Sequence, residues 1–211
     1  MPKSLDDLFL HMLKDVYHAE KQVNRALPRI AKQVGDEELR AAIDKALELT
    51  HANVERIEGV FEAIDKPKKA IPCEAMQGIL AELEEAAEDS EGDVLDAGVL
   101  AAVQTINHYQ MVRYGTLRAW GEQAGYKATV DLLKQSAEQS RALDKELSRL
   151  AEAKINASAD HEEKGGEAVD ADEGETVELE ATKPVAKSRA KAPAKPAATK
   201  APAKPRGRTS K

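Results

Sequence analysis

Residues 4–35 read SLDDLFLHMLKDVYHAEKQVNRALPRIAKQVG, and their apolar side chains recur at every third or fourth position. This spacing is typical of one buried face of an α-helix. Ser4 followed three residues later by Asp7 has the pattern of a capping box, which marks a helix start. Gly35 is a residue type that commonly ends helices. The stretch therefore predicts one long amphipathic helix.

The same periodicity continues on the C-terminal side of this helix. A second long helix is expected from near Asp36 until Pro67 and Pro72 prevent its continuation. Because the turn between the two helices is short, they should form an antiparallel hairpin. A shorter helix is expected in residues 74–89, and residues 90–92 break it.

A second hairpin follows, in which Asp93 is expected to cap a long helix that stops near Gly125. The last helix should run from about Lys127 to Leu150. Two hairpins joined by a long connection, here residues 65–92, have the connectivity of ferritin-like folds. The sequence thus predicts an all-α, ferritin-like four-helix bundle with a short extra helix in the crossover connection.

Composition and charge divide the chain into three parts. Hydrophobic residues make up 42% of the 211 residues and aromatic residues only 3%, which favours helices over strands and one core over several. We expect a helical bundle in residues 1–155, an acidic disordered linker in 156–182 and a basic disordered tail in 183–211. Their net charges are −8, −9 and +10, so the overall charge of −7 conceals a basic segment.

Neither a membrane nor an oxidising compartment is indicated. The N-terminal residues place acids and a histidine where a signal peptide needs a continuous apolar core, and no run of about 18 apolar residues is present. Cys73 has no second cysteine to pair with, and a buried packing role is favoured for it over a redox sensor. These features predict a cytoplasmic protein without a membrane partner.

Two polar features interrupt the apolar stripes of the first hairpin. Glu20 follows Val16 and precedes Val23 on the face assigned to the interior, where a carboxylate must be paired, protonated or metal-bound unless it lies at the helix edge. Glu48 and His51 form a Glu-x-x-His pair, as in carboxylate-bridged di-metal bundles. The simpler alternatives are a solvent-facing Glu20 and a chance motif in a Glu-rich helix.

The second hairpin carries amides and a hydroxyl on its apolar faces. Asn107 and Gln110 share such a face, with His108 beside them, and Ser140 and Asp144 occupy the corresponding line of the last helix. Divalent metal ions prefer carboxylates to amides. A hydrogen-bonded polar layer is therefore the alternative to a metal site.

Several short motifs together carry a family resemblance. They are Tyr17-x-Ala19-Glu20-Lys21-Gln22, Glu48-x-Thr50, Arg56-Ile57-Glu58-x-x-Phe61, Cys73-x-Ala75-Met76-x-Gly78, His108-Tyr109, Tyr114-Gly115-Thr116-Leu117, and Leu132-Leu133 with Asp144. With these motifs, most of residues 5–152 resembles the YciE/YciF family of bacterial ferritin-like stress-response proteins.

The resemblance implies a homodimeric bundle that responds to osmotic, bile or oxidative stress. It also implies a central di-metal site of iron or manganese held by carboxylates and histidines. The candidate metal ligands are Glu20, Glu48, His51, His108, Glu138 and Asp144.

This chain departs from the family pattern on its second hairpin. The family's fourth helix usually reads Glu-His-Tyr-Glu, whereas residues 107–110 read NHYQ, and residues 138–140 read EQS where the family has consecutive acids. Each lost carboxylate removes charge that would neutralise a divalent ion. The implied site is therefore weaker than the family's, or vacant, and catalytic activity is left open.

The basic tail resembles the low-complexity tails of linker histones. It contains KAPAKP at 191–196 and again at 200–205, with ten Lys or Arg, five Pro and no acid. Such a chain stays extended and can neutralise phosphates without reading bases. The alternatives are a solubility tail and a tail that binds its own acidic linker. The candidate nucleic-acid contacts are Lys187, Arg189, Lys191, Lys195, Lys200, Lys204, Arg206 and Arg208.

Two functions are compatible with these features. The first is a ferritin-like stress-response protein with a partly degenerate di-metal site and a tail for sequence-independent nucleic-acid contact. The second is a non-metal, DNA-associated dimeric scaffold in which the bundle is purely structural. Both predict a cytoplasmic, nucleoid-associated protein.

Overall fold

The computed structural model describes residues 2–162, and every regular element in this range is helical. The elements are α1 (Leu5–Ile30), α2 (Glu37–Ala63), α3 (Glu74–Glu88), α4 (Gly92–Gln123), α5 (Lys127–Leu150), the short π-helix η1 (Ala151–Ile155) and α6 (Asn156–Glu162). The predicted all-α class is confirmed. Within residues 2–162, no helix is both long and apolar enough to cross a membrane.

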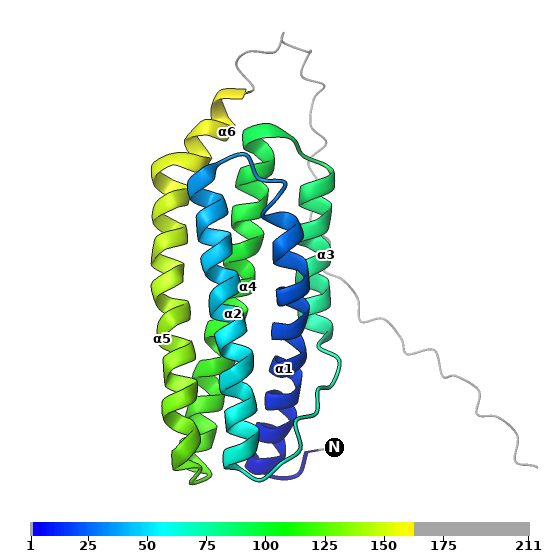
Figure 1. Ribbon diagram of the computed structural model, residues 1–211, viewed down its shortest axis with the longest axis vertical. Coiled ribbons are helices and arrows are strands. Elements are labelled where there is room, and N and C mark those ends of the chain that lie inside the picture. Colours follow the sequence, from blue (N-terminus) through cyan, green and yellow to red (C-terminus); the bar gives the residue numbers. More distant parts are fainter. Residues whose placement is uncertain (1, 163–211) are drawn as a thin grey trace, which may run out of the picture. The chain divides into compact units, whose positions relative to one another are not determined.

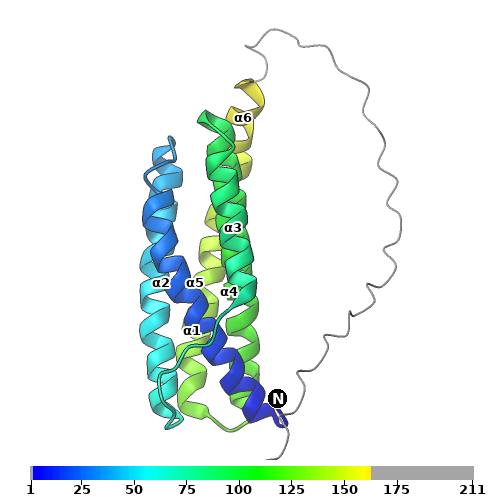
Figure 2. The same cartoon turned by 90° about the vertical axis from the view of Figure 1, so that its right-hand side faces the viewer.

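The four long helices α1, α2, α4 and α5 form the bundle. In Figure 1, α1 runs away from the end that holds the N-terminus, α2 returns, α4 runs in the same direction as α2, and α5 returns again. The connection between α2 and α4 crosses the bundle and includes α3, which packs on the outside against α4 and α1 (Figure 2). The predicted bundle with an extra helix in its crossover connection is therefore confirmed.

The start of α1 follows the prediction, but its end does not. The Ser4 hydroxyl accepts a hydrogen bond from the Asp7 amide at 3.0 Å. The helix ends at Ile30, before the expected stop at Gly35. The chain after it forms the tighter i→i−3 hydrogen bonds of a 3₁₀ turn, such as the bond from the Gln33 amide to the Ile30 carbonyl at 2.9 Å.

Two other boundaries also differ from expectation. Asp93 does not cap α4, because the helix begins at Gly92 and Asp93 lies inside its first turn, where its charge favours the helix dipole. At the other end, helical structure continues past residue 155 to Glu162. The buried Ala151 and Ile155 extend the apolar stripe of α5 by one further turn at spacings of four. The rest of the expected linker and the whole tail lie outside the described residues.

The core consists of two apolar clusters separated by polar side chains. Phe9, Leu13 and Phe61 belong to one cluster, and Leu27 and Ile43 belong to the other. On each of the four long helices, buried polar residues lie near the boundary between the two clusters. These residues are Glu20 on α1, Thr50 and Asn53 on α2, Asn107 and Gln110 on α4, and Ser136 and Ser140 on α5.

A buried carboxylate of α4 fixes the turn between α1 and α2. Asp96 is 2% exposed, and its two oxygens accept hydrogen bonds from the backbone amides of Gly35 at 2.9 Å and Asp36 at 2.7 Å. Asp36 in turn caps α2 by accepting from the Leu39 amide at 2.9 Å. The second hairpin thereby positions the turn of the first.

Replacing Asp96 with alanine should destabilise the bundle by about 3 kcal/mol, because it removes two hydrogen bonds from the turn amides to a buried carboxylate. Urea unfolding followed by circular dichroism measures this loss. Asp44→Ala is the matched control, since Asp44 is exposed in the middle of α2, and it should change stability by less than about 0.5 kcal/mol. Equal losses in the two variants would contradict the role given to Asp96.

Candidate functional site at the centre of the bundle

Glu20 of α1 is the centre of a buried hydrogen-bond network. Its side chain is fully buried, and both carboxylate oxygens accept hydrogen bonds from Nε2 of Gln110 on α4, at 3.0 and 2.9 Å. The hydroxyl of Tyr114, also fully buried, donates to Oε1 at 2.6 Å. The carboxyl group thus joins α1 to α4 in the gap between the two apolar clusters.

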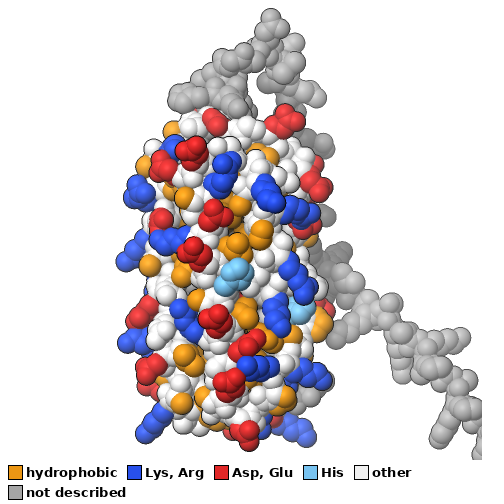
Figure 3. Space-filling model, in the orientation of Figure 1, with side chains coloured by type: hydrophobic (Ala, Val, Ile, Leu, Met, Phe, Trp, Pro, Cys, Tyr) orange, Lys and Arg blue, Asp and Glu red, His pale blue; other side chains and the backbone are white. Residues whose placement is uncertain are grey.

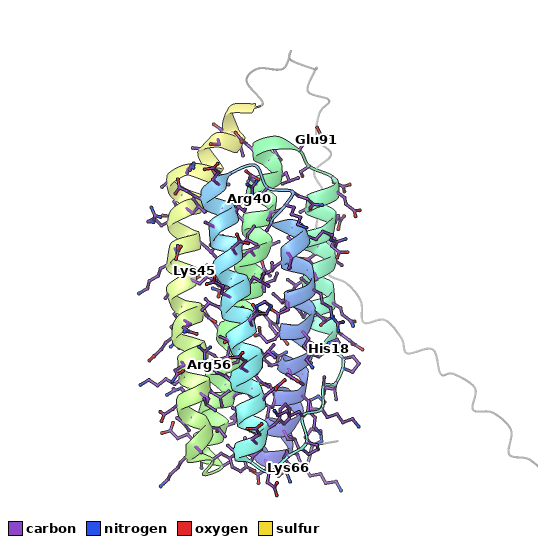
Figure 4. All side chains as sticks on the ribbon, in the orientation of Figure 1. His18, Arg40, Lys45, Arg56, Lys66 and Glu91 are labelled. Carbon is purple, nitrogen blue, oxygen red and sulfur yellow. The ribbon has the colours of Figure 1, made fainter. Side chains whose placement is uncertain are left out.

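The same network reaches α2 and α5. Asn53 of α2, 2% exposed, is a further hydrogen-bond donor to Glu20. Nη1 of Arg56 donates to Oδ1 of Asn53 at 3.0 Å and to the Ser136 hydroxyl of α5 at 3.4 Å. Figure 4 shows Arg56 on the side of α2 that faces α5. All four helices of the bundle therefore contribute to one network.

A second set of polar groups lies one turn along the helices. Asn107 is 2% exposed, and its Nδ2 donates to the Ser140 carbonyl at 3.0 Å, which fixes the orientation of the amide. Oδ1 of Asn107 then has no hydrogen-bond partner in the described part of the chain, and the same is true of Oδ1 of Asn24 and Oε1 of Gln139. The second hairpin thus presents amides to the interior, as its sequence indicates.

Burial dominates the protonation of Glu20. It raises the pKa of this carboxyl to about 8, against the hydrogen bonds from Tyr114, Gln110 and Asn53 and the charge of Arg56, which all lower it. Desolvation disfavours the charged form of an acid in this way. Most Glu20 side chains are therefore protonated at neutral pH. Burial and the neighbouring Glu20 also raise the pKa of Tyr114 well above its usual range.

The structure brings only some of the expected metal ligands together. His108 Nε2 lies 2.5 Å from Asp144 Oδ1, in a surface pair between α4 and α5 in which the histidine side chain is 60% exposed. Glu138 is exposed and pairs with Lys134 at 3.8 Å. Within residues 2–162, no three His, Cys, Asp or Glu side chains form a group that could hold a metal ion.

The expectation that Glu20, Glu48 and His51 meet inside the bundle is wrong. Both Glu48 and His51 are exposed, because they lie on the side of α2 opposite its buried face. That face consists of Leu39, Ala42, Ile43, Ala46, Thr50, Asn53, Ile57, Val60 and Phe61. The polar residues of α2 that turn inward are Thr50 and Asn53, with the half-buried Arg56 one turn further along.

The central residues do not fit a di-metal centre. Such centres in ferritin-like bundles use one Glu from each of two helices and a Glu-x-x-His pair from each of the other two. The polar side chains at the centre of this bundle are Glu20, Thr50, Asn53, Arg56, Asn107, Gln110, Ser136 and Ser140. Glu20 is the one carboxyl group among them, none of them is a histidine, and the guanidinium of Arg56 is always charged.

Sequence reasoning missed Asn53, Arg56, Ser136 and Tyr114. The signal that identifies the α2 residues is the phase of the apolar stripe, which steps from Ile43 through Ala46 and Thr50 to Asn53. The Glu-x-x-His motif instead indicated Glu48 and His51, which lie outside the helical phase of this stripe. A charged residue such as Arg56 gives no comparable signal, because most arginines are exposed.

Cys73 belongs to a separate cluster that anchors the crossover connection. It is buried, and its thiol lies 3.0 Å from the hydroxyl of Tyr109, which donates to Asp15 at 2.8 Å. The backbone amide of Cys73 donates to Nδ1 of His18 at 3.2 Å. Burial raises the pKa of the thiol, which disfavours the reactive thiolate. This environment suits a packing residue.

The candidate nucleic-acid residues of the tail lie outside the described residues. They are Lys187, Arg189, Lys191, Lys195, Lys200, Lys204, Arg206 and Arg208. Their expected contacts remain predictions.

Comparison with known proteins places the bundle among close relatives. Residues 4–160 match the family model described as domain of unknown function DUF892. Protein YciF of Escherichia coli is 40% identical over 161 residues, which cover 75% of this chain and 97% of YciF.

Solved structures agree with this similarity. The crystal structure of the E. coli stress protein YciF superposes with a TM-score of 0.70 at 39% identity, covering 74% of this chain and 99% of that one. YcfI of Rhodopseudomonas palustris gives a TM-score of 0.67 at 34% identity, covering 69% and 94%. The family model ends at residue 160, near the start of the acidic segment 156–182 and before the basic segment 183–211.

The buried carboxyl should make stability depend on pH. The native state keeps the Glu20 proton up to a pH of about 8, whereas the unfolded chain releases it near 4.5. The protonated Glu20 therefore makes its full contribution to the free energy of unfolding below pH 4.5. This contribution falls as pH rises from there through about 8, by no more than about 1.4 kcal/mol per pH unit. Glu20→Gln should remove this component.

Urea unfolding across this pH window measures the effect. The wild-type free energy of unfolding should fall relative to that of Glu20→Gln as pH rises. Glu138→Gln is the control, because Glu138 is exposed, and its curve should run parallel to the wild type. A parallel curve for Glu20→Gln as well would refute the assignment of the proton to Glu20.

Proposed function

The chain belongs to the DUF892 family and is similar to the E. coli stress protein YciF, and from this we propose that it is a stress-response protein whose bundle carries a nucleic-acid-binding tail. The observation that carries the proposal is the separation of charge along the chain. Residues 1–155 have a net charge of −8, whereas residues 183–211 hold ten cations and no acid.

The bundle serves as a scaffold in this proposal. Its centre holds a single carboxyl group that already accepts hydrogen bonds from Gln110, Tyr114 and Asn53. A carboxyl group that is mostly protonated at neutral pH and already engaged by these neighbours is a poor ligand for a redox-active ion. This favours the non-metal alternative over a metal-dependent oxidase or catalase.

The bundle surface supports the assignment of nucleic-acid contact to the tail. On the face drawn in Figure 3, acidic and basic side chains are interspersed and form no continuous basic patch. A body of net negative charge is repelled by a polyanion. Ten cations spaced among prolines can instead follow the phosphate backbone and release its counterions. Contact with the nucleoid in the cytoplasm follows from this function.

A second copy of the chain is the partner that we propose for the outer face of α4. Val112 is 67% exposed there, the most of the large hydrophobic side chains exposed in residues 2–162. An open hollow beside it is lined by Met111, Val112, Gly115, Thr116, Ala119, Trp120 and Arg141. Small residues along a helix let a second helix approach closely. A dimer would present two tails to one duplex and raise avidity.

The tail should account for binding to duplex DNA of any sequence. In a gel shift, the full chain should bind two unrelated duplexes equally, and a chain ending at residue 162 should bind neither. If about five to eight of the tail cations contact phosphates, log affinity should fall against log salt with a slope of roughly −4 to −7.

Removing the acidic residues 163–182 is the matched control for charge. Because these carboxylates compete for the same cations, their removal should strengthen binding at low salt. Equal DNA binding with and without residues 183–211 would show that the tail does not contact the DNA. The assignment to the family would still hold.

The oligomeric state should depend on Val112. Light scattering coupled to size exclusion should give about twice the chain mass of 22.9 kDa for the wild type and the monomer mass for Val112→Glu, because a charge there cannot be buried unpaired. Val94→Glu is the control, since Val94 is exposed elsewhere on α4. A monomeric wild type, or a dimeric Val112→Glu, would show that this face is not the interface.

A further inference from the structure

Arg56 places a permanent positive charge at the centre of the bundle. Its Nη1 donates to Oδ1 of Asn53 at 3.0 Å and to the Ser136 hydroxyl at 3.4 Å. The guanidinium therefore joins α2 to α5 at the level of the buried polar network.

The charge of Arg56 lies against buried groups at the centre. Its partners Asn53 and Ser136 are 2% and 1% exposed. A guanidinium stays protonated at all physiological pH values. The centre thus already contains a permanent cation, and a divalent ion placed beside it would be repelled.

The remaining carboxylate is also occupied. Gln110 donates to both oxygens of Glu20, Tyr114 donates to one of them, and Asn53 adds a further hydrogen bond. A carboxylate offers about four lone-pair sites. An incoming metal ion would have to displace these donors and would gain only amide and hydroxyl ligands in return, which hold divalent ions weakly.

We propose that the guanidinium of Arg56, bonded to Asn53 on α2 and to Ser136 on α5, closes the centre of this bundle to divalent ions. The proposal concerns the bundle alone, so it stands or falls independently of nucleic-acid binding by the tail.

The first test uses the full-length protein and Co²⁺ or Mn²⁺. After treatment with EDTA and dialysis, addition of either ion should leave the melting temperature unchanged, and Co²⁺ should give no absorption band of a protein-bound ion. Binding of an ion by the wild type that is lost in Glu20→Gln would overturn the proposal, because it would show that the centre is open.

The second test changes Arg56 alone. Arg56→His should bind Co²⁺ at least about tenfold more tightly than the wild type, because it removes the repelling charge and supplies an imidazole ligand. Arg56→Lys keeps the charge and should show no gain. Equal Co²⁺ binding by the two variants would mean that the guanidinium does not close the centre.

The third test builds a di-metal ligand pattern around Glu20 in two variants, one without Arg56 and one with it. One variant carries Asn53→Glu, Gln110→Glu, Ser136→Glu and Gln139→His together with Arg56→His, and the other carries the same four changes and keeps Arg56. The first should bind two Co²⁺ ions per chain, and the second should bind them at least about 100-fold more weakly. Equal affinities would overturn the proposal. Circular dichroism confirms that both variants are helical, and the single substitutions decide the question if either is not.

Discussion

The burial of one carboxyl group at the centre of the bundle constrains much of the rest of the structure. Glu20 is fully buried, so it requires donors from its neighbours, and these come from Gln110 and Tyr114 on α4 and Asn53 on α2. An acid in such surroundings is costly if any donor is missing. The register of α1 against α4 and α2 is therefore fixed at this level. The hydrogen bonds of Glu20 therefore determine the register of the helices, and the two apolar clusters contribute buried area on either side of it.

The helices and their order could be predicted from the sequence because they depend on periodicity. The apolar stripes, the Ser4 and Asp36 caps and the prolines after α2 are local signals, and the structure confirms the elements that they predict. The interior position of Glu20 was also readable, since it replaces an apolar residue in a continuous stripe. These inferences needed no knowledge of which helices pack together.

The composition of the central site was harder to predict because it depends on helix phase and on contacts between distant residues. Glu48 and His51 match the sequence motif of a ligand pair but lie outside the buried face of α2. Arg56 and Ser136 are 80 residues apart, and nothing local marks either of them as part of a network. Asp96 gave no local signal for the same reason. A polar residue can be assigned to the interior only when the apolar periodicity of its own helix, on both sides of it, places it on the buried face.

The attachment of the first turn to Asp96 also has a consequence for the order of folding. Gly35 and Asp96 are 61 residues apart, so α1 and α2 can be synthesised and can collapse as a helical pair before the carboxylate that fixes their turn exists. Contacts of such separation form late, because closing the intervening loop costs entropy. Before α4 docks, the turn has only the hydrogen bonds of its own hairpin, such as those from the Arg40 side chain to the carbonyls of Ala31 and Val34, and Asp96 then completes its geometry. The last step in forming the first hairpin therefore depends on the arrival of the second.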